Sequence, residues 1–445
     1  MKKRRKINPQ KIFCFVSFIF ILTCCFWYGG RFIYFYKDSK KTEKKEANII
    51  ATTLKTSNQK EKTFKKDNEE YYFYQDATNN YLMYSNILWR IIKINEDNSI
   101  VLITDTPITS LAYGTNEDNY SDSNIIKWLN TDSKNDNSGI LESKLNNTSN
   151  YLVKTKVCID TIDNIEKLTC NKTSDEYYLG LLSIEDYVKT GGKKSFIKNS
   201  SISYLSNKNK EKEIWYINED GSLSSSSGDD ILGIRPVVTL SPTLEIKSGT
   251  GTEKDPYKIE DKNEYFASYV KLDKDIWRVY DVDEQNVKLV LMDYIKDQNN
   301  EKLEYIYSNN TYIHNDTIYG SLAYYLNHTY LNSLSYKDLI LNSNYNNGYY
   351  GEDSDYNLKE LFSNKIDTKV GLPSIGEVTL NHELDNYFTS TGVSKNSSFV
   401  YINKNNGELT NKKVTSEANI VPCITIKKDN LTKGTGSIND PYRTE

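Results

Sequence analysis

The feature that most constrains the fold of this chain is an internal repeat with a period of about 185 to 190 residues. The tryptophan and arginine at Trp89 and Arg90 return at Trp277 and Arg278. In both places an acidic turn and an alternating apolar run follow, which is typical of a two-stranded hairpin. A period of this length is too long for a solenoid repeat and matches a whole domain.

Further landmarks recur in the same order in the two copies. They pair as Trp128-Leu129-Asn130 with Tyr325-Leu326-Asn327, Leu182-Ser183-Ile184-Glu185 with Pro373-Ser374-Ile375 and Glu377, Trp215-Tyr216-Ile217-Asn218 with Val400-Tyr401-Ile402-Asn403, Ile234-Arg235-Pro236-Val237-Val238 with Ile420-Val421-Pro422-Cys423-Ile424, and Gly249-Thr250-Gly251 with Gly434-Thr435-Gly436. We expect the first two of these pairs to lie in short helices. The glycine pair is expected to form the turn that ends each copy.

The composition favours a β-rich class. The 36 tyrosines stand among abundant Asn, Ser and Ile, so strand-forming aromatic and β-branched residues alternate with polar turn residues. The predicted fold class is therefore α+β and β-rich, with two tandem homologous domains. We place the first domain at residues 67–260 and the second, more divergent domain at residues 261–445.

The N-terminal segment predicts a membrane anchor. A basic run from Lys2 to Lys6 precedes an apolar stretch from Ile12 to Tyr28 and an aromatic patch from Phe32 to Tyr36. Apolar residues of this number can cross a bilayer, and the basic run places the N-terminus inside the cell. The expectation is a cytoplasmic tail at residues 1–11, a transmembrane signal anchor at 12–36 that contacts the lipid bilayer, and a C-terminal ectodomain outside the cell.

Three other interpretations of the apolar segment stay open. A cleaved signal peptide would need a small-residue cleavage site, which the sequence after the apolar stretch does not offer. A lipoprotein signal would use Cys24, but Thr23 fits that signal poorly. A buried core helix is the third. After the anchor, residues 37–66 are lysine-rich and lack an apolar period, which predicts a flexible stalk.

The order of the landmarks resembles a domain family of unknown function found in surface proteins of Gram-positive bacteria. The first copy, about residues 85 to 245, matches this pattern best. In the second copy Tyr325 stands in place of Trp128 and Val421 in place of Arg235. The positions that carry the resemblance, which we expect to be structural, are Trp89, Arg90, Trp128, Leu129, Asn130, Ser183, Glu185, Arg235, Pro236, Trp277, Arg278 and Pro422.

The closing strand of the first copy, with its G-x-R-P pattern at Gly233 to Pro236, resembles the end of C-type-lectin-like and formylglycine-generating-enzyme-like folds. The resemblance implies such a fold for each domain. It implies no activity, because unrelated functions share one fold.

Arginine is scarce beyond the N-terminal segment, where only Arg90, Arg235, Arg278 and Arg443 occur. Arg90 and Arg278 occupy equivalent places in the repeat. A guanidinium beside a strand tryptophan can stack on aromatic rings and bind a carboxylate, which suits either an internal tie or a ligand anchor. We favour the internal tie.

Three cysteines lie in the ectodomain. Cys158 and Cys170 are close in sequence and are the candidates for a disulfide in an oxidising compartment, although sequence alone leaves two separate thiols as an alternative. Cys423 replaces a valine of the first copy, so we expect a buried, unpaired thiol.

The residues that enzymes use are sparse. The three histidines, His314, His328 and His382, are all in the second copy and match no zinc-ligand spacing. We interpret them as surface or satisfied side chains. Acidic turns at Glu117 to Asp122 and Glu352 to Asp355 match no calcium loop and are interpreted as solvated turns. The sequence therefore predicts no catalytic residues, no metal site and no cofactor.

These features favour a non-catalytic surface binding or adhesion protein whose ligand is a glycan or a protein outside the cell. Tyrosine-rich surfaces are common in such proteins. A carboxylate-dependent enzyme acting on envelope glycans and a purely structural spacer are the alternatives. The net charge of −4 offers no basic surface for nucleic acid, which we exclude as a partner.

Overall fold

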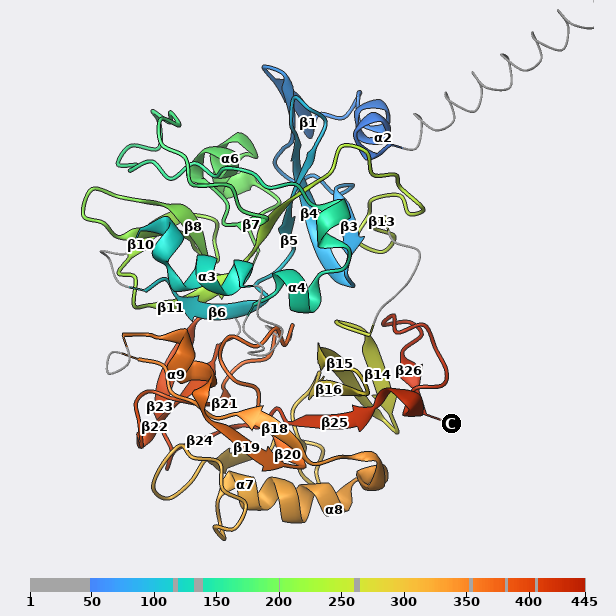
Figure 1. Ribbon diagram of the computed structural model, residues 1–445, viewed down its shortest axis with the longest axis vertical. Coiled ribbons are helices and arrows are strands. Elements are labelled where there is room, and N and C mark those ends of the chain that lie inside the picture. The colour runs from blue at the N-terminus through green and yellow to red at the C-terminus, as the bar shows by residue number, and fades with distance from the viewer. Residues whose placement is uncertain are drawn as a thin grey trace, which may run out of the picture.

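The computed structural model describes residues 49–114, 119–131, 139–199, 201–259, 265–351, 355–380, 383–404 and 407–444. We call residues 49–259 the first half and residues 265–444 the second half. The two halves are stacked along the longest axis of the molecule (Figure 1). Both consist mainly of β-strands with a few short helices, so the β-rich α+β class is confirmed.

The first half contains five described α-helices and thirteen strands. The helices are α2 (Ile50–Ser57), α3 (Asn124–Asn130), α4 (Leu141–Lys144), α5 (Thr148–Tyr151) and α6 (Ile184–Lys189). The strands are β1 (Phe64–Asp67), β2 (Glu70–Phe73), β3 (Tyr81–Tyr84), β4 (Ile87–Ile94), β5 (Ile100–Thr104), β6 (Thr109–Ala112), β7 (Leu179–Gly180), β8 (Ser203–Lys208), β9 (Ile214–Ile217), β10 (Leu223–Ser226), β11 (Ile231–Ile234), β12 (Val237–Leu240) and β13 (Tyr257–Lys258).

The second half contains a broken helix made of α7 (Leu322–Tyr324), a π-helical segment (Tyr325–Tyr330) and α8 (Leu331–Ser333), followed by α9 (Leu358–Ser363). Its strands are β14 (Tyr269–Leu272), β15 (Asp275–Val282), β16 (Asn286–Leu291), β17 (Glu304–Ile306), β18 (Ser343–Asn346), β19 (Lys365–Thr368), β20 (Val370–Gly371), β21 (Tyr387–Gly392), β22 (Phe399–Asn403), β23 (Leu409–Lys413), β24 (Glu417–Asn419), β25 (Cys423–Lys427) and β26 (Tyr442–Arg443).

Each half has a main sheet and a second sheet, and the strand orders agree. In the first half the path β3-β4-β5-β12-β7 is antiparallel, and β13 joins β3 in parallel. In the second half the path β14-β15-β16-β25-β20 has the same pairings, and β26 joins β14 in parallel. The second sheets follow β10-β9-β8-β11-β6 and β23-β22-β21-β24-β17.

The agreement extends to a β-bulge in the central strand of each main sheet. The register of β4 against β5 shifts between Ile91 and Lys93, and that of β15 against β16 shifts between Val279 and Asp281. The predicted hairpins after Trp89 and Trp277 are confirmed by these pairings. A bulge inserts one residue and redirects the side chains beyond it. Lys93 and Asp281 are the residues that each bulge places on the sheet surface.

The cores are rich in tyrosine as well as in aliphatic residues. The largest fully buried side chains are Trp89, Trp128, Trp277, Arg235, Tyr72, Tyr84, Tyr113, Tyr187, Tyr204, Tyr280, Tyr307 and Tyr312. Many tyrosines therefore fill the interior of the sheets instead of forming a binding surface. The expectation of a tyrosine-rich surface is wrong for these residues.

The folded part of the chain begins before the predicted domain boundary at residue 67. Helix α2 buries Ile50, Ala51 and Leu54 in the first core, and the backbone N–H of Ile50 donates to the carbonyl of Leu244 at 3.0 Å. Strand β1 then pairs with β2. The flexible-stalk prediction is wrong for residues 50–66, because three apolar residues on one helix face suffice to dock this short segment.

The transmembrane prediction is also corrected. The expected span at residues 12–36 lies outside the described ranges, as does the expected tail at 1–11. Within those ranges, no helix combines the length and the apolar character that crossing a bilayer requires.

The helices around the repeat landmarks agree with the sequence in the first half, and in the second half Tyr325-Leu326-Asn327 lies in the π-helical segment, also as expected. Trp128 lies in α3, and Ser183 caps α6, where its Oγ accepts from the backbone N–H of Asp186 at 3.1 Å. The counterpart from Pro373 to Glu377 is a turn and not a helix. Gly376 has a φ of +78° there, which interrupts helical geometry.

The two halves share a packed boundary. The core of the first half continues into Tyr350, Phe362 and Ile375 of the second half. The indole N–H of Trp128 donates to the carbonyl of Gly376 at 3.1 Å. This boundary brings α3 of the first half against the segment between β18 and β21, and α4 against β15 (Figure 1).

Candidate binding groove

Most of the predicted motif positions are structural. Trp89, Trp128, Leu129 and Trp277 are completely buried. Pro236 and Pro422 hold equivalent turns, because their carbonyls accept from the backbone N–H groups of Thr104 and Leu291. These residues therefore shape the sheets and their boundary.

Asn130 fixes the short edge strand β7. Its Nδ2 donates to the carbonyl of Leu179 at 2.9 Å, and its Oδ1 accepts from the N–H of the same residue at 3.2 Å. Asn327 makes the same pair of bonds to Val370 of β20, at 3.0 and 2.9 Å. The conserved spacing of these two asparagines in the repeat thus has a structural cause.

Arg90 is an internal tie. Its guanidinium donates to Asn80 Oδ1 and to the carbonyl of Ala77, and it lies 3.8 Å from the ring centroid of Tyr81. Asp105 completes the set as an ion-pair partner at 3.4 Å. Partners within the protein use most of the N–H donors of this guanidinium, so few donors remain for a ligand.

Arg278 and Arg235 are also held inside the fold. Arg278 Nε donates to the carbonyl of Ala267 at 3.1 Å, and its guanidinium lies over Tyr269. Arg235 Nε donates to the carbonyl of Thr104 at 2.9 Å, and burial lowers its pKa to about 10. Its Nη2 makes no hydrogen bond to any described residue. Arg235 is 2% exposed and cannot reach a ligand at the surface.

The side chains that do converge on a cavity lie elsewhere, on the main sheet of the first half. We call this cavity the first-half groove; its volume is about 210 Å³. Its floor is formed by β4, β5 and β12, and its walls by β2, α6 and the chain around the two cysteines. The lining includes Glu70, Tyr72, Lys93, Val101, Thr155, Lys156, Val157, Cys158, Cys170, Thr173, Ser183, Glu185, Asp186, Lys189, Val237 and Thr239.

Lys93 is the centre of the charged network in the groove. Its Nζ lies 3.1 Å from Glu70 Oε1 and 3.1 Å from Asp186 Oδ1. The hydroxyl of Tyr72 is 2.8 Å from Glu70 Oε2 and 3.1 Å from Asp186 Oδ1. The bulge in β4 places Lys93 where it meets carboxylates from a neighbouring strand and from α6.

The network shifts the pKa values of its members in opposite directions. Burial alone would lower the pKa of Lys93, but Asp186 and Glu70 outweigh burial and raise that pKa to about 12. Burial opposes ionisation of Asp186, yet Lys93 and Tyr72 hold its pKa below the usual range. Burial and the two carboxylates raise the pKa of Tyr72. At neutral pH Asp186 is thus ionised, Lys93 is protonated and Tyr72 is a neutral phenol.

A second ion pair extends the network along α6. Lys189 Nζ lies 3.0 Å from Glu185 Oε1 and 3.2 Å from Asp67 Oδ2. Asp186 Oδ2 and Glu185 Oε2 accept no hydrogen bond from any described residue, although each carboxylate has room for several donors. These side chains are 22% and 29% exposed, so their free oxygens can be reached from the solvent.

A disulfide between Cys158 and Cys170 forms one wall of the groove, as the sequence analysis expects. The two Cα atoms are 5.7 Å apart, within the range that disulfides span. The carbonyl of Cys158 accepts from Ser206 Oγ at 2.7 Å, which anchors this wall to the second sheet. Cys423 is buried and unpaired, also as expected, and burial raises its pKa.

The two cysteine sulfurs and a Glu185 oxygen lie close enough together to suggest a metal site. The donor set does not fit a metal, because sulfurs joined in a disulfide are not thiolates and bind metal ions poorly. We therefore assign this cluster to the wall of the groove.

The corresponding position in the second half is closed. Asp281 and Lys288 take the places of Lys93 and Val101, and Lys144 of the first half forms an ion pair with Asp281. Tyr345 covers the floor and lies 3.1 Å from Thr425 Oγ1 through its hydroxyl. The site that is open in the first half is thus filled by protein in the second.

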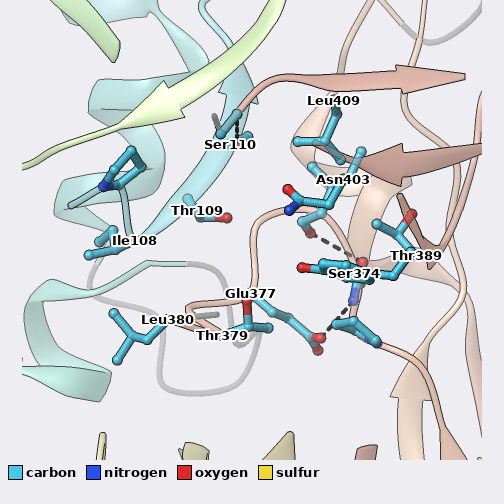
Figure 2. Close-up of a pocket in the computed structure, with 15 residues that line it drawn as sticks. Ile108, Thr109, Ser110, Ser374, Glu377, Thr379, Leu380, Thr389, Asn403 and Leu409 are labelled. Carbon is cyan, nitrogen blue, oxygen red and sulfur yellow. Dashed lines mark hydrogen bonds between the residues drawn. The ribbon is translucent and has the colours of Figure 1, made fainter. Parts of the chain in front are cut away.

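Glu377, the counterpart of Glu185, lies nearby in a small pocket between the halves. Figure 2 shows Ile108, Thr109 and Ser110 of the first half facing Ser374, Glu377 and Asn403 of the second half, among other residues. The volume of about 40 Å³ holds a few water molecules and no larger ligand.

Hydrogen bonds from Ser374 N–H at 2.8 Å and from Asn346 Nδ2 at 2.9 Å hold the Glu377 carboxyl in this pocket. Burial raises its pKa, and Lys288 opposes that shift without cancelling it. Glu377 is therefore a buried acid in a small pocket between the halves.

The histidines are not gathered into one site. His314 is buried, so the expectation of a surface position is wrong for it; its Nε2 lies 3.3 Å from the carbonyl of Val370. Its Nδ1 has no described hydrogen-bond partner, and burial lowers its pKa to about 4. His328 is exposed. His382, and the acidic residues at 117, 118, 352 and 353, lie in gaps between the described ranges.

Comparisons with known proteins give no relative from which a function can be transferred. No family model matches the chain, and no curated protein or solved structure matches it. The candidate site must therefore be judged on its own geometry.

Proposed function

We propose that this protein is a non-catalytic binding protein that works in an oxidising compartment outside the cytoplasm, and that it consists of two tandem, homologous, lectin-like modules. The first-half groove is the observation that carries the binding role. It is an accessible cavity on which six charged side chains and a phenol converge. The disulfide wall supports the oxidising compartment, since such bonds persist mainly there.

The tandem relationship is supported by features that follow one another in both halves. These are the strand order of two sheets, the bulge before Lys93 and Asp281, and the asparagine that holds the edge strand. If the two halves had arisen independently, each would have had to acquire all of these features in the same order along the chain. The lectin-like fold rests on the G-I-R-P segment, which connects β11 to β12 in the first half.

The groove best suits a ligand that supplies hydrogen-bond donors. The groove is lined by three carboxylates and three ammonium groups, from Glu70, Glu185, Asp186, Lys93, Lys156 and Lys189, so its charges balance. Asp186 Oδ2 and Glu185 Oε2 accept no hydrogen bond from any described residue and are left as acceptors for a ligand. Hydrogen bonds to charged acceptors are stronger than neutral ones. A glycan that carries amino groups besides its hydroxyls therefore fits the groove chemically.

The same geometry argues against hydrolysis by a carboxylate pair. Glycoside hydrolysis needs one carboxylic acid whose pKa is raised so that it holds a proton at neutral pH. The pKa of Asp186 is lowered, and Glu70 shares Lys93 and Tyr72 with it. Glu377 has a raised pKa but is buried, and its pocket of about 40 Å³ is too small for a sugar ring. A purely structural spacer, in turn, would not need an accessible charged cavity such as the first-half groove.

The test is titration calorimetry of the full-length protein with the tetramer of β-linked glucosamine and with its N-acetylated form. We expect the glucosamine tetramer to bind and the acetylated form to bind at least about tenfold more weakly, because acetylation removes the charged donors. The Glu185→Gln variant should weaken binding of the glucosamine tetramer by a similar factor.

Asp220→Asn is the matched control, because Asp220 pairs with Lys193 on the exposed β9–β10 turn away from the groove. Equal binding of both tetramers would reject recognition of the amino group. Binding that is unchanged in Glu185→Gln would remove the groove as the site. If neither tetramer bound, the proposed ligand class would be wrong.

A further inference from the structure

A row of aromatic side chains is exposed at the far end of the second half. Tyr319 is 83% exposed, and its ring packs edge-on against Tyr324 with centroids 5.2 Å apart. Tyr324 in turn stacks on the exposed ring of His328 at 4.2 Å. We call Tyr319, Tyr324 and His328 the aromatic row. It lies along α7 and the start of the π-helical segment, at the end of the molecule opposite the first half (Figure 1).

The loop that presents Tyr319 is held by its own hydrogen bonds. Ser321 Oγ donates to the carbonyls of Asn315 and Ile318, at 3.1 and 2.7 Å. Thr317 donates through its N–H and its hydroxyl to Asn315 Oδ1. The exposed ring is thus carried by an ordered support. Contiguous exposed apolar surface often marks an interaction site, and loops on a rigid support often carry binding residues.

A polar pocket adjoins the aromatic row. Its volume is about 290 Å³, and its lining includes Asp316, Asp367 and the 42%-exposed Ile313. His328 Nε2 lies 3.2 Å from the backbone carbonyl of Asp316, so the row and the pocket share this residue as a border. In the part of the chain that the structure describes, neither the Asp316 nor the Asp367 carboxylate has a hydrogen-bond or ion-pair partner.

We propose that the aromatic row and this pocket together bind a neutral sugar ring of a glycan. A sugar ring has apolar C–H faces and a rim of hydroxyl donors. The exposed faces of the row can cover the C–H groups, while the Asp316 and Asp367 carboxylates accept from the hydroxyls. An apolar platform beside a few unpaired polar groups is the usual composition of a small-molecule site.

The electrostatics of the site disfavour an anionic ligand, because two unpaired carboxylates repel phosphate and other anionic groups. The hydroxyl groups of a neutral sugar supply the hydrogen-bond donors that these carboxylates can accept. The site lies in the second half of the molecule, so the proposal is independent of the ligand assigned to the first-half groove.

The experiment measures binding of the full-length protein to immobilised neutral tetrasaccharides of glucose, N-acetylglucosamine, galactose and mannose, followed by calorimetric titration of the strongest of them. We expect Tyr319→Ala to weaken that binding roughly tenfold, through loss of ring stacking, and Tyr319→Phe to retain it. Asp316→Asn and Asp367→Asn should each weaken it by a factor of roughly three to ten.

Ile438→Ala is the control for a general loss of exposed apolar surface, since Ile438 is 57% exposed and lies near the C-terminal strand. The proposal is overturned if none of the four tetrasaccharides binds, or if Tyr319→Ala and Ile438→Ala change binding equally. Binding that disappears on addition of a calcium chelator would also overturn it, because the carboxylates would then hold a cation and not the hydroxyls. Loss of binding in Glu185→Gln alone would assign the sugar to the first-half groove.

Discussion

The main sheets of the two halves carry opposite charges at the same place. Lys93 and Asp281 each follow a bulge in the central strand, yet Lys93 lines an accessible cavity whereas Asp281 is covered by Lys144 from the other half. One position thus serves a candidate ligand site in the first half and a contact between halves in the second. Two sheets with the same strand order can therefore differ in the contacts that their surfaces make.

The charge of each position fits its surroundings. Burial opposes ionisation of Asp281, but the ammonium groups of Lys144 and Lys288 outweigh it and lower the pKa of this carboxyl. Lys93 is balanced by Glu70 and Asp186 from its own half. Asp281 thus shares counter-charges from both halves, Lys144 and Lys288, whereas the partners of Lys93 all come from its own half.

The largest expected effect tests the boundary between the halves. Replacement of Trp128 by Ala removes a completely buried ring and the hydrogen bond to Gly376, and we expect a loss of roughly 3–5 kcal/mol in the free energy of unfolding. Tyr325→Ala at the corresponding position should cost less, because Tyr325 is only partly buried. Urea denaturation of both variants measures the difference. Equal losses would contradict the asymmetry of the two positions.

The next test compares the two lysines. Lys144→Met leaves the Asp281 carboxylate buried without its nearest cation, which should cost about 3–5 kcal/mol of unfolding free energy. Lys93→Met should cost roughly 1–3 kcal/mol, since water can enter the groove and solvate the acids left behind.

The double variant Lys144→Met/Asp281→Leu serves as the control for the lysine test, because it removes both charges of the buried pair and should recover most of the lost stability. Urea denaturation at pH 7 gives all of these values. A larger loss for Lys93→Met than for Lys144→Met would reverse our interpretation of the comparison.

The disulfide distinguishes the halves chemically. Cys158→Ser/Cys170→Ser opens a loop with a sequence separation of 12 and should cost about 3 kcal/mol, on the chain-entropy account. Dithiothreitol should lower the melting temperature of the wild-type protein and leave that of the double variant unchanged. Cys423→Ala, the matched change in the second half, should not alter the response to the reductant.

The smallest expected effect is a pair of opposite pH dependences. The pKa of Asp186 is lowered, so its stabilisation is complete above a pH of about 4 and is lost as the pH falls further. The stability gap between wild type and Asp186→Asn should therefore shrink in acid. The pKa of Glu377 is raised, so wild type should lose stability relative to Glu377→Gln as the pH rises from about 4 toward neutrality. Thermal melts across this range check both signs.

The parts of the fold that the sequence predicted correctly are those fixed by local pattern and repetition. The hairpins after Trp89 and Trp277 follow from alternating apolar residues next to acidic turns. The internal role of Arg90 follows from its place beside a strand tryptophan. The cysteine pair follows from its short spacing. In each case the residues that form the feature are close together in the sequence, or their pattern recurs in the second half.

The candidate sites could not be predicted, because they depend on contacts between distant segments. Glu70, Lys93 and Asp186 come from three separate elements, and none of them stands in a recognisable spacing. The ion pair of Lys144 with Asp281 joins residues from different halves. The sequence did not single out Tyr319 as a site residue, because it is one of 36 tyrosines and differs from the others by its exposure in the structure.

The parallel pairing of β13 with β3, and of β26 with β14, has a further consequence. The closing strands β13 and β26 are two residues long, and each forms the outer edge of its main sheet beside β3 or β14. Unpaired sheet edges are templates on which other chains can add strands, and very short edge strands are one way in which proteins prevent this. Each main sheet thus ends in an edge that resists aggregation.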